Sequence, residues 1–161
     1  HEAYPSKGVY FTECSGGEWD TDWASVLVWN FQNLFIGAVR NWAKTVLLWN
    51  LALDENHGPH NGGCGNCRGV VTIREEGTVE YNVEYYIIGH LSKFVSPRAY
   101  RIGSDTHGDR LETVAFENLN GSTVLVALNP GTNSVTFDVR WGERYVSYAL
   151  LPRSVVTFYA P

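Results

Sequence analysis

The residue best placed to do chemistry in this chain is a glutamate at the end of an apolar run. Residues 9–15 read VYFTECS, so Glu13 follows hydrophobic residues and precedes small residues that favour a loop. This pattern predicts a buried parallel strand with a carboxylate at its C-terminal tip. In α/β barrels, catalytic groups lie at the C-terminal ends of the strands. Glu13 is therefore a candidate catalytic residue, although a glutamate also ends many strands simply because it is polar.

A second polar region follows the next apolar run. Residues 45–53 (TVLLWNLAL) predict another buried strand, and residues 54–69 (DENHGPHNGGCGNCRG) follow as a long loop rich in Gly, Asn and His. If the two strands are neighbours, at a spacing of about 4.8 Å, Asp54 and Glu55 come close to Glu13. The simpler interpretation is that these two acids begin a polar loop and are solvated or capping.

The same loop contains the side chains that bind zinc in many proteins. His57, His60, Cys64 and Cys67 could form a site with two histidines and two cysteines. Pro59 and the loop glycines make the segment irregular, which argues against a metal site. Zinc ligation and a local disulfide between the two cysteines are the alternatives.

Two helices are expected to position these strands. Residues 21–44 predict a helix that is apolar on most sides and begins near Thr21 or Asp22 as N-cap. A strand, a helix and a strand at this spacing form a crossover with two parallel strands. A second helix, with Asn82 as a plausible cap and Pro97 as a stop, is indicated by apolar residues at spacings of four, four and three. They are Val83, Ile87, Leu91 and Phe94.

The C-terminal part has a different pattern, with short alternating segments that are typical of half-buried antiparallel strands. Asn120-Gly121 is a strong hairpin signal. We therefore predict a small β-sandwich, with a boundary near residues 95–99 that divides the chain into domains 1–96 and 97–161. The predicted strands are 100–104, 111–117, 124–129, 135–139, 145–150 and 155–159.

Composition and charge exclude several classes of partner. The chain has 161 residues, 44% of them hydrophobic and 18% charged, as in a globular protein. With 12 basic and 17 acidic residues the net charge is −5, and no basic stripe is present that would bind nucleic acid. No apolar run approaches the roughly 20 residues that span a membrane. The absence of methionine, and a first strand with no preceding element to pair with, indicate part of a longer polypeptide.

Four segments together carry a family resemblance. They are FTECSGG (11–17), LLWNLALDENHGPHNGGCGNCRGVV (47–71), EYYIIGHLSKFVSPRAYRI (84–102) and LPRSVVTFY (151–159). In this order they resemble the C-terminal portion of glycoside hydrolase family 30, the glucosylceramidase and endo-β-1,6-glucanase group of retaining β-glycosidases. The resemblance implies the last two strands and helices of a (β/α)8 barrel followed by an antiparallel β-sandwich.

The resemblance also implies a role for Glu13, which matches the glutamate after the seventh barrel strand, the family's nucleophile. The enzyme would hydrolyse β-glucosidic bonds, in β-1,6-glucan or a related β-glycoside, and would need no metal or cofactor. The family carries its acid/base on the fourth barrel strand, which this chain does not contain. The N-terminal remainder of the same enzyme is therefore an expected partner, and the chain alone is expected to be inactive.

Further candidate residues for substrate binding lie on the second strand and in the neighbouring loops. Trp49 matches a tryptophan that lines the family's glycone pocket, and aromatic rings such as Trp19 offer a flat face to a sugar. His60 and Asn61, in the loop, are candidates for binding substrate hydroxyls. The glycone and the linkage are not fixed by these residues.

The cysteines are expected to reflect secretion. Since secreted glycosidases that resemble this chain need no metal, we expect Cys64 and Cys67 to form a disulfide. Cys14 is then either a buried free thiol or the partner of a cysteine elsewhere in the polypeptide. Asn120-Gly121-Ser122 is an N-glycosylation sequon on a predicted turn, and the turn alone also explains it.

The alternative function belongs to another class. The β-sandwich could be the working part of a non-catalytic carbohydrate-binding or structural module, with the preceding helices and strands as packing. Aromatic residues make up 14% of the chain, with six Trp and nine Tyr, and they would serve sugar binding in either case.

Overall fold

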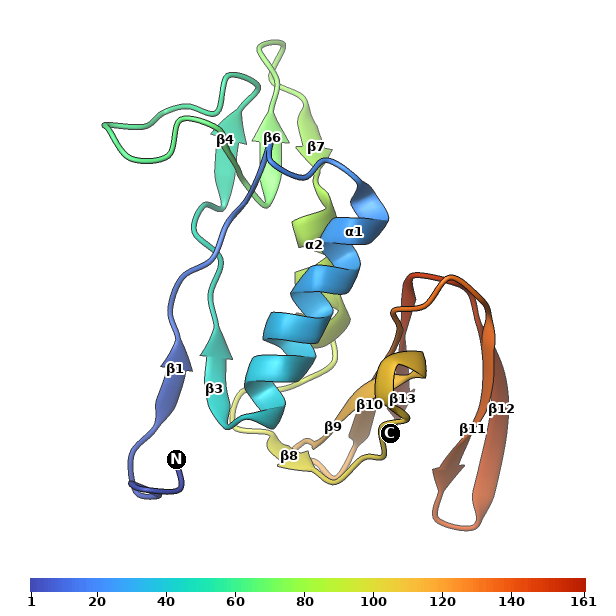
Figure 1. Cartoon of the computed structure of the whole chain (residues 1–161). Helices are drawn as coiled ribbons and strands as arrows, with labels where there is room; N and C mark the ends of the chain where they lie inside the picture. The colour runs from blue at the N-terminus through green and yellow to red at the C-terminus, as the bar shows by residue number, and fades with distance from the viewer. The chain divides into compact units, whose positions relative to one another are not determined.

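The chain folds into two compact units. The computed structural model describes residues 1–161, and these divide into His1–Lys93 and Phe94–Pro161. Figure 1 shows the strands and the two long helical segments of the first unit, and the sheets of the second.

The first unit is built on a parallel strand pair. Strand β1 (Val9–Phe11) pairs with β3 (Ala43–Val46), and Val9 lies opposite Ala43. The helical segment between these strands makes the crossover that the sequence predicted. The first two predicted strands are therefore neighbours, and they are parallel.

The single strand predicted over residues 45–53 is wrong. Strand β3 ends at Val46, and a separate strand β4 (Ala52–Asp54) begins after an irregular segment. The reason is a change of partner. The first half of the segment pairs with β1, whereas β4 pairs in parallel with β6 (Val71–Ile73). The backbone bends between the two pairings, which an unbroken apolar run does not reveal.

The first helix begins where the sequence predicted and ends earlier. Helix α1 (Trp23–Asn30) has Asp22 as N-cap, whose carboxylate accepts a hydrogen bond of 2.6 Å from the Ser25 amide. It continues as a π-helix, η1 (Phe31–Ala38). The predicted end at residue 44 is wrong, because Trp42 adopts a left-handed backbone conformation (φ 74°) and turns the chain into β3.

The second helix packs on the first. Helix α2 (Val83–Ser92) buries Val83 and Ile87, and its His90 ring meets the Phe31 ring edge-on at 5.7 Å. Asn82 stands at the N-cap position, yet its side chain makes no capping hydrogen bond. Its amide group donates instead to the carbonyl of Gly69 and to the hydroxyl of Thr72, each at 2.9 Å.

Short strands complete the first unit. Strand β2 (Gly16–Gly17) pairs antiparallel with β5 (Cys67–Arg68). Strand β7 (Val79–Tyr81) forms a hairpin with β6, which gives a three-stranded sheet in the order β4-β6-β7. None of these short strands was predicted, because two or three residues inside a loop show no periodicity.

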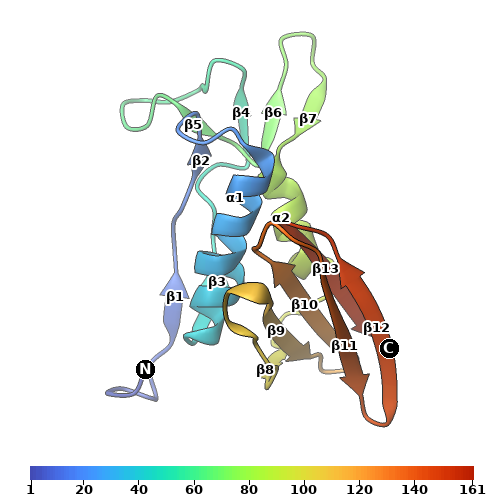
Figure 2. The same ribbon diagram turned by 45° about the vertical axis from the view of Figure 1, so that its right-hand side comes forward.

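All six strands predicted for the second unit are present. One sheet has the order β13-β10-β9-β8, and the other is the hairpin β11-β12 (Figure 2). This unit is therefore a β-sandwich with one short 3-10 helix, η2 (Gly108–Arg110). The strands are β8 (Tyr100–Ile102), β9 (Glu112–Glu117), β10 (Thr123–Asn129), β11 (Val135–Trp141), β12 (Arg144–Leu150) and β13 (Ser154–Ala160).

The sandwich core contains residues of both sheets. Leu111 and Ala127 cluster with Leu150 of the second sheet, and Phe137 and Val156 pack against them. The predicted hairpin turn joins β9 to β10. Gly121 is the residue of that turn with a left-handed conformation (φ 84°).

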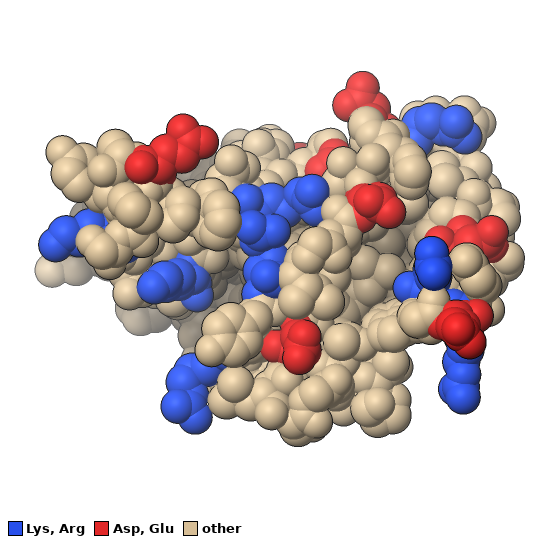
Figure 3. Space-filling model, turned by 90° about the horizontal axis from the view of Figure 1, so that it is seen from below, with Lys and Arg blue, Asp and Glu red and all other residues tan.

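Side chains of both charges lie on the surface. Figure 3 shows acidic and basic side chains scattered among uncharged residues on the face it presents. None of the helices has the length and the apolar character needed to cross a membrane.

Candidate active site

Glu13 stands just beyond the end of β1, where its side chain is exposed. The neighbouring segment holds this strand end through two backbone hydrogen bonds. The Leu47 amide donates to the Phe11 carbonyl at 3.2 Å, and the Trp49 amide donates to the Cys14 carbonyl at 2.7 Å. The residues on both sides of Glu13 are thus tied to the adjacent chain segment.

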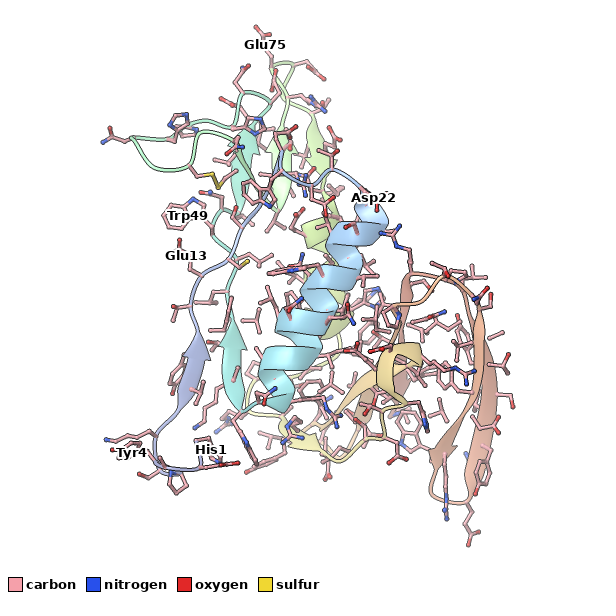
Figure 4. The ribbon with its side chains drawn as sticks, in the orientation of Figure 1. His1, Tyr4, Glu13, Asp22, Trp49 and Glu75 are labelled. Carbon is pink, nitrogen blue, oxygen red and sulfur yellow. A yellow bond between two sulfur atoms is a disulfide. The ribbon has the colours of Figure 1, made fainter.

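Trp49 lies beside Glu13. In Figure 4 both side chains are on the same side of the ribbon and point away from helix α1. The Trp49 residue is 55% exposed, so its ring is not a core ring. A carboxylate next to an exposed aromatic face can accommodate a sugar ring.

The other expected substrate-binding residues differ in how firmly they are held. Trp19 is 59% exposed, and its ring lies over Gly17, where an added Cβ would come within 2.1 Å of it. His60 and Asn61 are exposed on the loop after β4. Neither makes a side-chain hydrogen bond.

Cys14 is a free, half-buried thiol next to Glu13. Burial raises the pKa of this thiol. The hydrogen bond to the Ser15 carbonyl lowers the pKa by less, and the Glu13 carboxylate raises it further. The effect of Glu13 is the smallest of the three.

A disulfide closes the loop beside this site. Cys64 and Cys67 are bonded, with Cα atoms 5.6 Å apart, which removes both thiolates from the alternative zinc site. Cys67 begins strand β5, and the Glu18 amide donates to the Asn66 carbonyl at 3.0 Å. The disulfide turn is therefore bound directly to the segment that follows Glu13.

A buried ion pair, which sequence reasoning missed, anchors the same segment. The Arg68 guanidinium donates to both carboxylate oxygens of Glu84, at 2.8 and 3.2 Å. The Arg68 side chain is 14% exposed and that of Glu84 only 2%. Arg68 also donates to the carbonyls of Gly17 and Asp20, each at 3.4 Å. The helical position of Glu84 gives no sequence signal for a partner sixteen residues away.

The acids that open the long loop have structural contacts. The Asp54 carboxylate accepts hydrogen bonds from the amides of Asn56 (2.8 Å) and Gly58 (2.7 Å), so it caps the loop. Glu55 accepts from the Glu75 amide at 3.2 Å. Both line a polar cavity of about 220 Å³ that does not include Glu13 or Trp49.

The second unit contains a larger cavity, of about 750 Å³. Residues of both sheets line it, among them Thr113, Phe137 and Trp141, and none of the expected substrate-binding residues does. Asn120 lies outside this cavity, on the exposed turn, where its side-chain oxygen accepts from the amide and the hydroxyl of Ser122 at 3.1 and 2.7 Å.

Comparison with known proteins identifies the family. Residues 99–158 match the Glycosyl hydrolase family 30 beta sandwich domain. Endo-1,6-beta-D-glucanase neg1 of Aspergillus fumigatus is 31% identical over 100% of this chain, which covers 33% of that protein. Endo-1,6-beta-D-glucanase BGN16.3 of Trichoderma harzianum is 33% identical, with 89% of this chain and 27% of that protein covered. The chain thus spans about a third of the length of these curated relatives.

Solved structures agree with the sequence comparisons. The endo-beta1,6-glucanase BT3312 superposes with a TM-score of 0.89 at 37% identity, covering 99% of this chain and 36% of that one. SrfJ from Salmonella typhimurium has the same TM-score at 25% identity, with the same coverage. The chain therefore belongs to glycosyl hydrolase family 30, and it corresponds to the C-terminal portion of that family's enzymes.

Proposed function

We propose that this chain carries the nucleophile of a retaining β-glycosidase, and that Glu13 is that residue. The observation that supports this most is the exposed carboxylate at the end of a parallel strand, with the exposed Trp49 ring beside it. A strand end is a rigid base, so the carboxylate oxygen can be aimed at one carbon of a bound sugar.

The chemistry has two steps. The Glu13 carboxylate attacks the anomeric carbon while a second carboxylic acid protonates the departing glycosidic oxygen, which gives a glycosyl ester. That second group then deprotonates a water molecule, which hydrolyses the ester and releases Glu13. In retaining enzymes the two carboxyl groups are about 5–5.5 Å apart. We assign the acid/base to a part of the polypeptide outside this chain.

The same proposal assigns the two parts of the chain. Residues 1–96 would be the last two strands and helices of a (β/α)8 catalytic barrel, and residues 97–161 the β-sandwich domain. The parallel β1-β3 pair joined by a helical crossover supports the barrel assignment. Each of these two strands has one unpaired edge, which the N-terminal remainder of the enzyme would cover.

We propose a β-1,6-glucan as the substrate, because the relatives from Aspergillus and Trichoderma and a similar solved structure carry that activity in their names. Trp49, Trp19, His60 and Asn61 would bind it. The disulfide supports secretion, because such bonds persist in oxidising compartments. Asn120 would be glycosylated only in a eukaryotic secretory pathway.

The test uses the full-length polypeptide that contains this chain. We expect turnover of β-1,6-glucan to exceed that of an aryl β-glucoside, and Glu13→Gln to lower kcat by at least about 10³-fold. Glu143→Gln, which changes an exposed glutamate in the second unit, is the matched control and should be unaffected. Near-normal turnover by Glu13→Gln would overturn the nucleophile assignment.

The isolated 161-residue chain should show no turnover, because leaving-group protonation requires the acid/base. Turnover by the isolated chain that Glu13→Gln abolishes would make Asp54 or Glu55 the leading candidate for the acid.

The second candidate function is a non-catalytic carbohydrate-binding module. The cavity of about 750 Å³ in the sandwich is the observation that favours it. Calorimetric titration with β-1,6-glucan distinguishes the two. Binding that survives Trp49→Ala and disappears in Trp141→Ala would favour the module.

A further inference from the structure

One buried ion pair connects three segments that are distant in sequence. Arg68 is in strand β5, Glu84 is in the first turn of helix α2, and the carbonyls of Gly17 and Asp20 belong to the segment that follows Glu13. The guanidinium donates to all of them, two bonds to the carboxylate and one to each carbonyl. Arginine suits this arrangement because its donors form a planar, rigid fork.

The Arg68–Glu84 ion pair packs closely against the backbone that follows Glu13. A Cβ added to Gly16 would lie 1.9 Å from the Glu84 carboxylate oxygen and 3.1 Å from the Arg68 guanidinium. The carboxylate therefore rests against the backbone only three residues beyond Glu13. Between Glu13 and Gly16, the Cys14 carbonyl accepts a hydrogen bond of 2.7 Å from the Trp49 amide.

Stability alone is a weak reason for such a pair. Replacing a buried ion pair by apolar residues of similar volume is often neutral or stabilising, because the cost of desolvating two charges offsets their attraction. What an apolar pair cannot reproduce is the directional set of hydrogen bonds to the Gly17 and Asp20 carbonyls. These bonds fix where the segment runs.

We propose that Arg68 and Glu84 are positioning residues for Glu13. This inference rests on the proposed function of Glu13 as nucleophile. The pair holds the segment from Gly16 to Asp20 against β5 and α2, so the strand end that carries Glu13 keeps its direction. Misplacement of a reacting group by about 1 Å can cost on the order of 10²-fold in rate. Loss of the pair should therefore slow attack on the anomeric carbon more than it weakens substrate binding.

The test measures the attack itself in the full-length enzyme. A 2,4-dinitrophenyl 2-deoxy-2-fluoro-β-glucoside has a leaving group that needs no protonation, so its covalent labelling rate reports the nucleophile. The main variant combines Arg68→Met with Glu84→Leu, which removes both charges and keeps side-chain volume. We expect it to retain the wild-type thermal midpoint, with KM within about twofold, while kcat and the labelling rate fall by about 10- to 100-fold.

The exposed pair Arg74 and Glu80, whose side chains are 42% and 51% exposed, supplies the matched control. Arg74→Met combined with Glu80→Leu should change neither rate. If the main variant fails to fold, Arg68→Lys replaces it. Lysine keeps the positive charge but lacks the planar set of guanidinium donors. A folded Arg68→Lys enzyme should therefore show a smaller but measurable loss of labelling rate.

A folded double variant with wild-type kcat and labelling rate, or an Arg68→Lys enzyme with both unchanged, would overturn the positioning role. A loss in kcat matched by an equal rise in KM would also contradict it. Glu13→Gln separates this outcome from failure of the proposed function. If Glu13→Gln is still labelled at the wild-type rate, the nucleophile assignment itself is wrong, whatever the Arg68 variants do.

Discussion

Glu13 and Cys14 are adjacent in the chain, and burial is the main cause of the raised pKa of the Cys14 thiol. The thiol is half-buried, and burial together with the Glu13 carboxylate raises its pKa. A negative carboxylate disfavours the thiolate, since the two charges repel. The thiol therefore reports the charge at position 13, and this makes Cys14 a probe of the candidate nucleophile.

We predict that Glu13→Gln lowers the pKa of Cys14 slightly, while burial keeps it above that of an ordinary thiol. More thiolate is then present at pH 8, so alkylation by iodoacetamide should be faster than in the wild type. The measurement is the alkylation rate against pH, without reductant so that the disulfide stays closed. Glu143→Gln should leave the profile unchanged. Identical profiles for Glu13→Gln and wild type would show that the two side chains do not interact.

For single residues, the sequence suggests those that a motif carries and does not reveal those that only packing brings together, so the roles of Glu13 and Trp49 stay predictions. Glu13 and Trp49 follow from the strand-end pattern and the family resemblance. Arg68 and Glu84 meet only because β5 and the start of α2 lie together in space. Asn82 was assigned to the right N-cap position, but its side-chain amide donates to the Gly69 carbonyl and the Thr72 hydroxyl, and it does not cap the helix.

Among the elements, the loop between β4 and β5 shows how a local crosslink can hold a site. The Cys64–Cys67 disulfide closes a turn of four residues, and β5 pairs directly with β2 in the segment after Glu13. A small closed loop contributes little to global stability in the chain-entropy account. Its main effect should be on local motion.

We predict that Cys64→Ser combined with Cys67→Ser lowers the free energy of unfolding by no more than about 2 kcal/mol. Hydrogen exchange of the peptide from residues 14–20 should rise clearly, since the Glu18 amide is bonded to the Asn66 carbonyl. Cys14→Ser is the control. Unchanged exchange, or stoichiometric zinc in the wild-type protein by elemental analysis, would refute this account of the loop.

The helices and strands also show which elements hydrophobic periodicity in the sequence can predict and which it cannot. Six sandwich strands were predicted because alternation over several residues is strong. The break between β3 and β4 was not predicted, because residues 47–51 stay largely apolar while the backbone changes partners. Strand β2 has only two residues, too few for a periodic pattern, and it is defined by its pairing with β5.

In the whole molecule, the match to the family model lies in the second unit, whereas the candidate site lies in the first. The second unit is a β-sandwich with a core formed by both sheets, and it carries the family match. The first unit has only two strands in its parallel pair, and its candidate site holds one suitable carboxylate where retaining hydrolysis requires two. Under the proposed function, the first unit would be part of a larger catalytic domain that supplies the second carboxyl group.

The site of covalent labelling in the full-length enzyme decides whether Glu13 is the nucleophile. A 2,4-dinitrophenyl 2-deoxy-2-fluoro-β-glycoside should form a stable glycosyl ester with the nucleophile. After digestion, mass spectrometry should find one added fluoroglycosyl group, on Glu13 in the peptide that contains VYFTECS. A label on any other carboxylate, or labelling that persists in Glu13→Gln, would contradict the assignment of Glu13 as nucleophile.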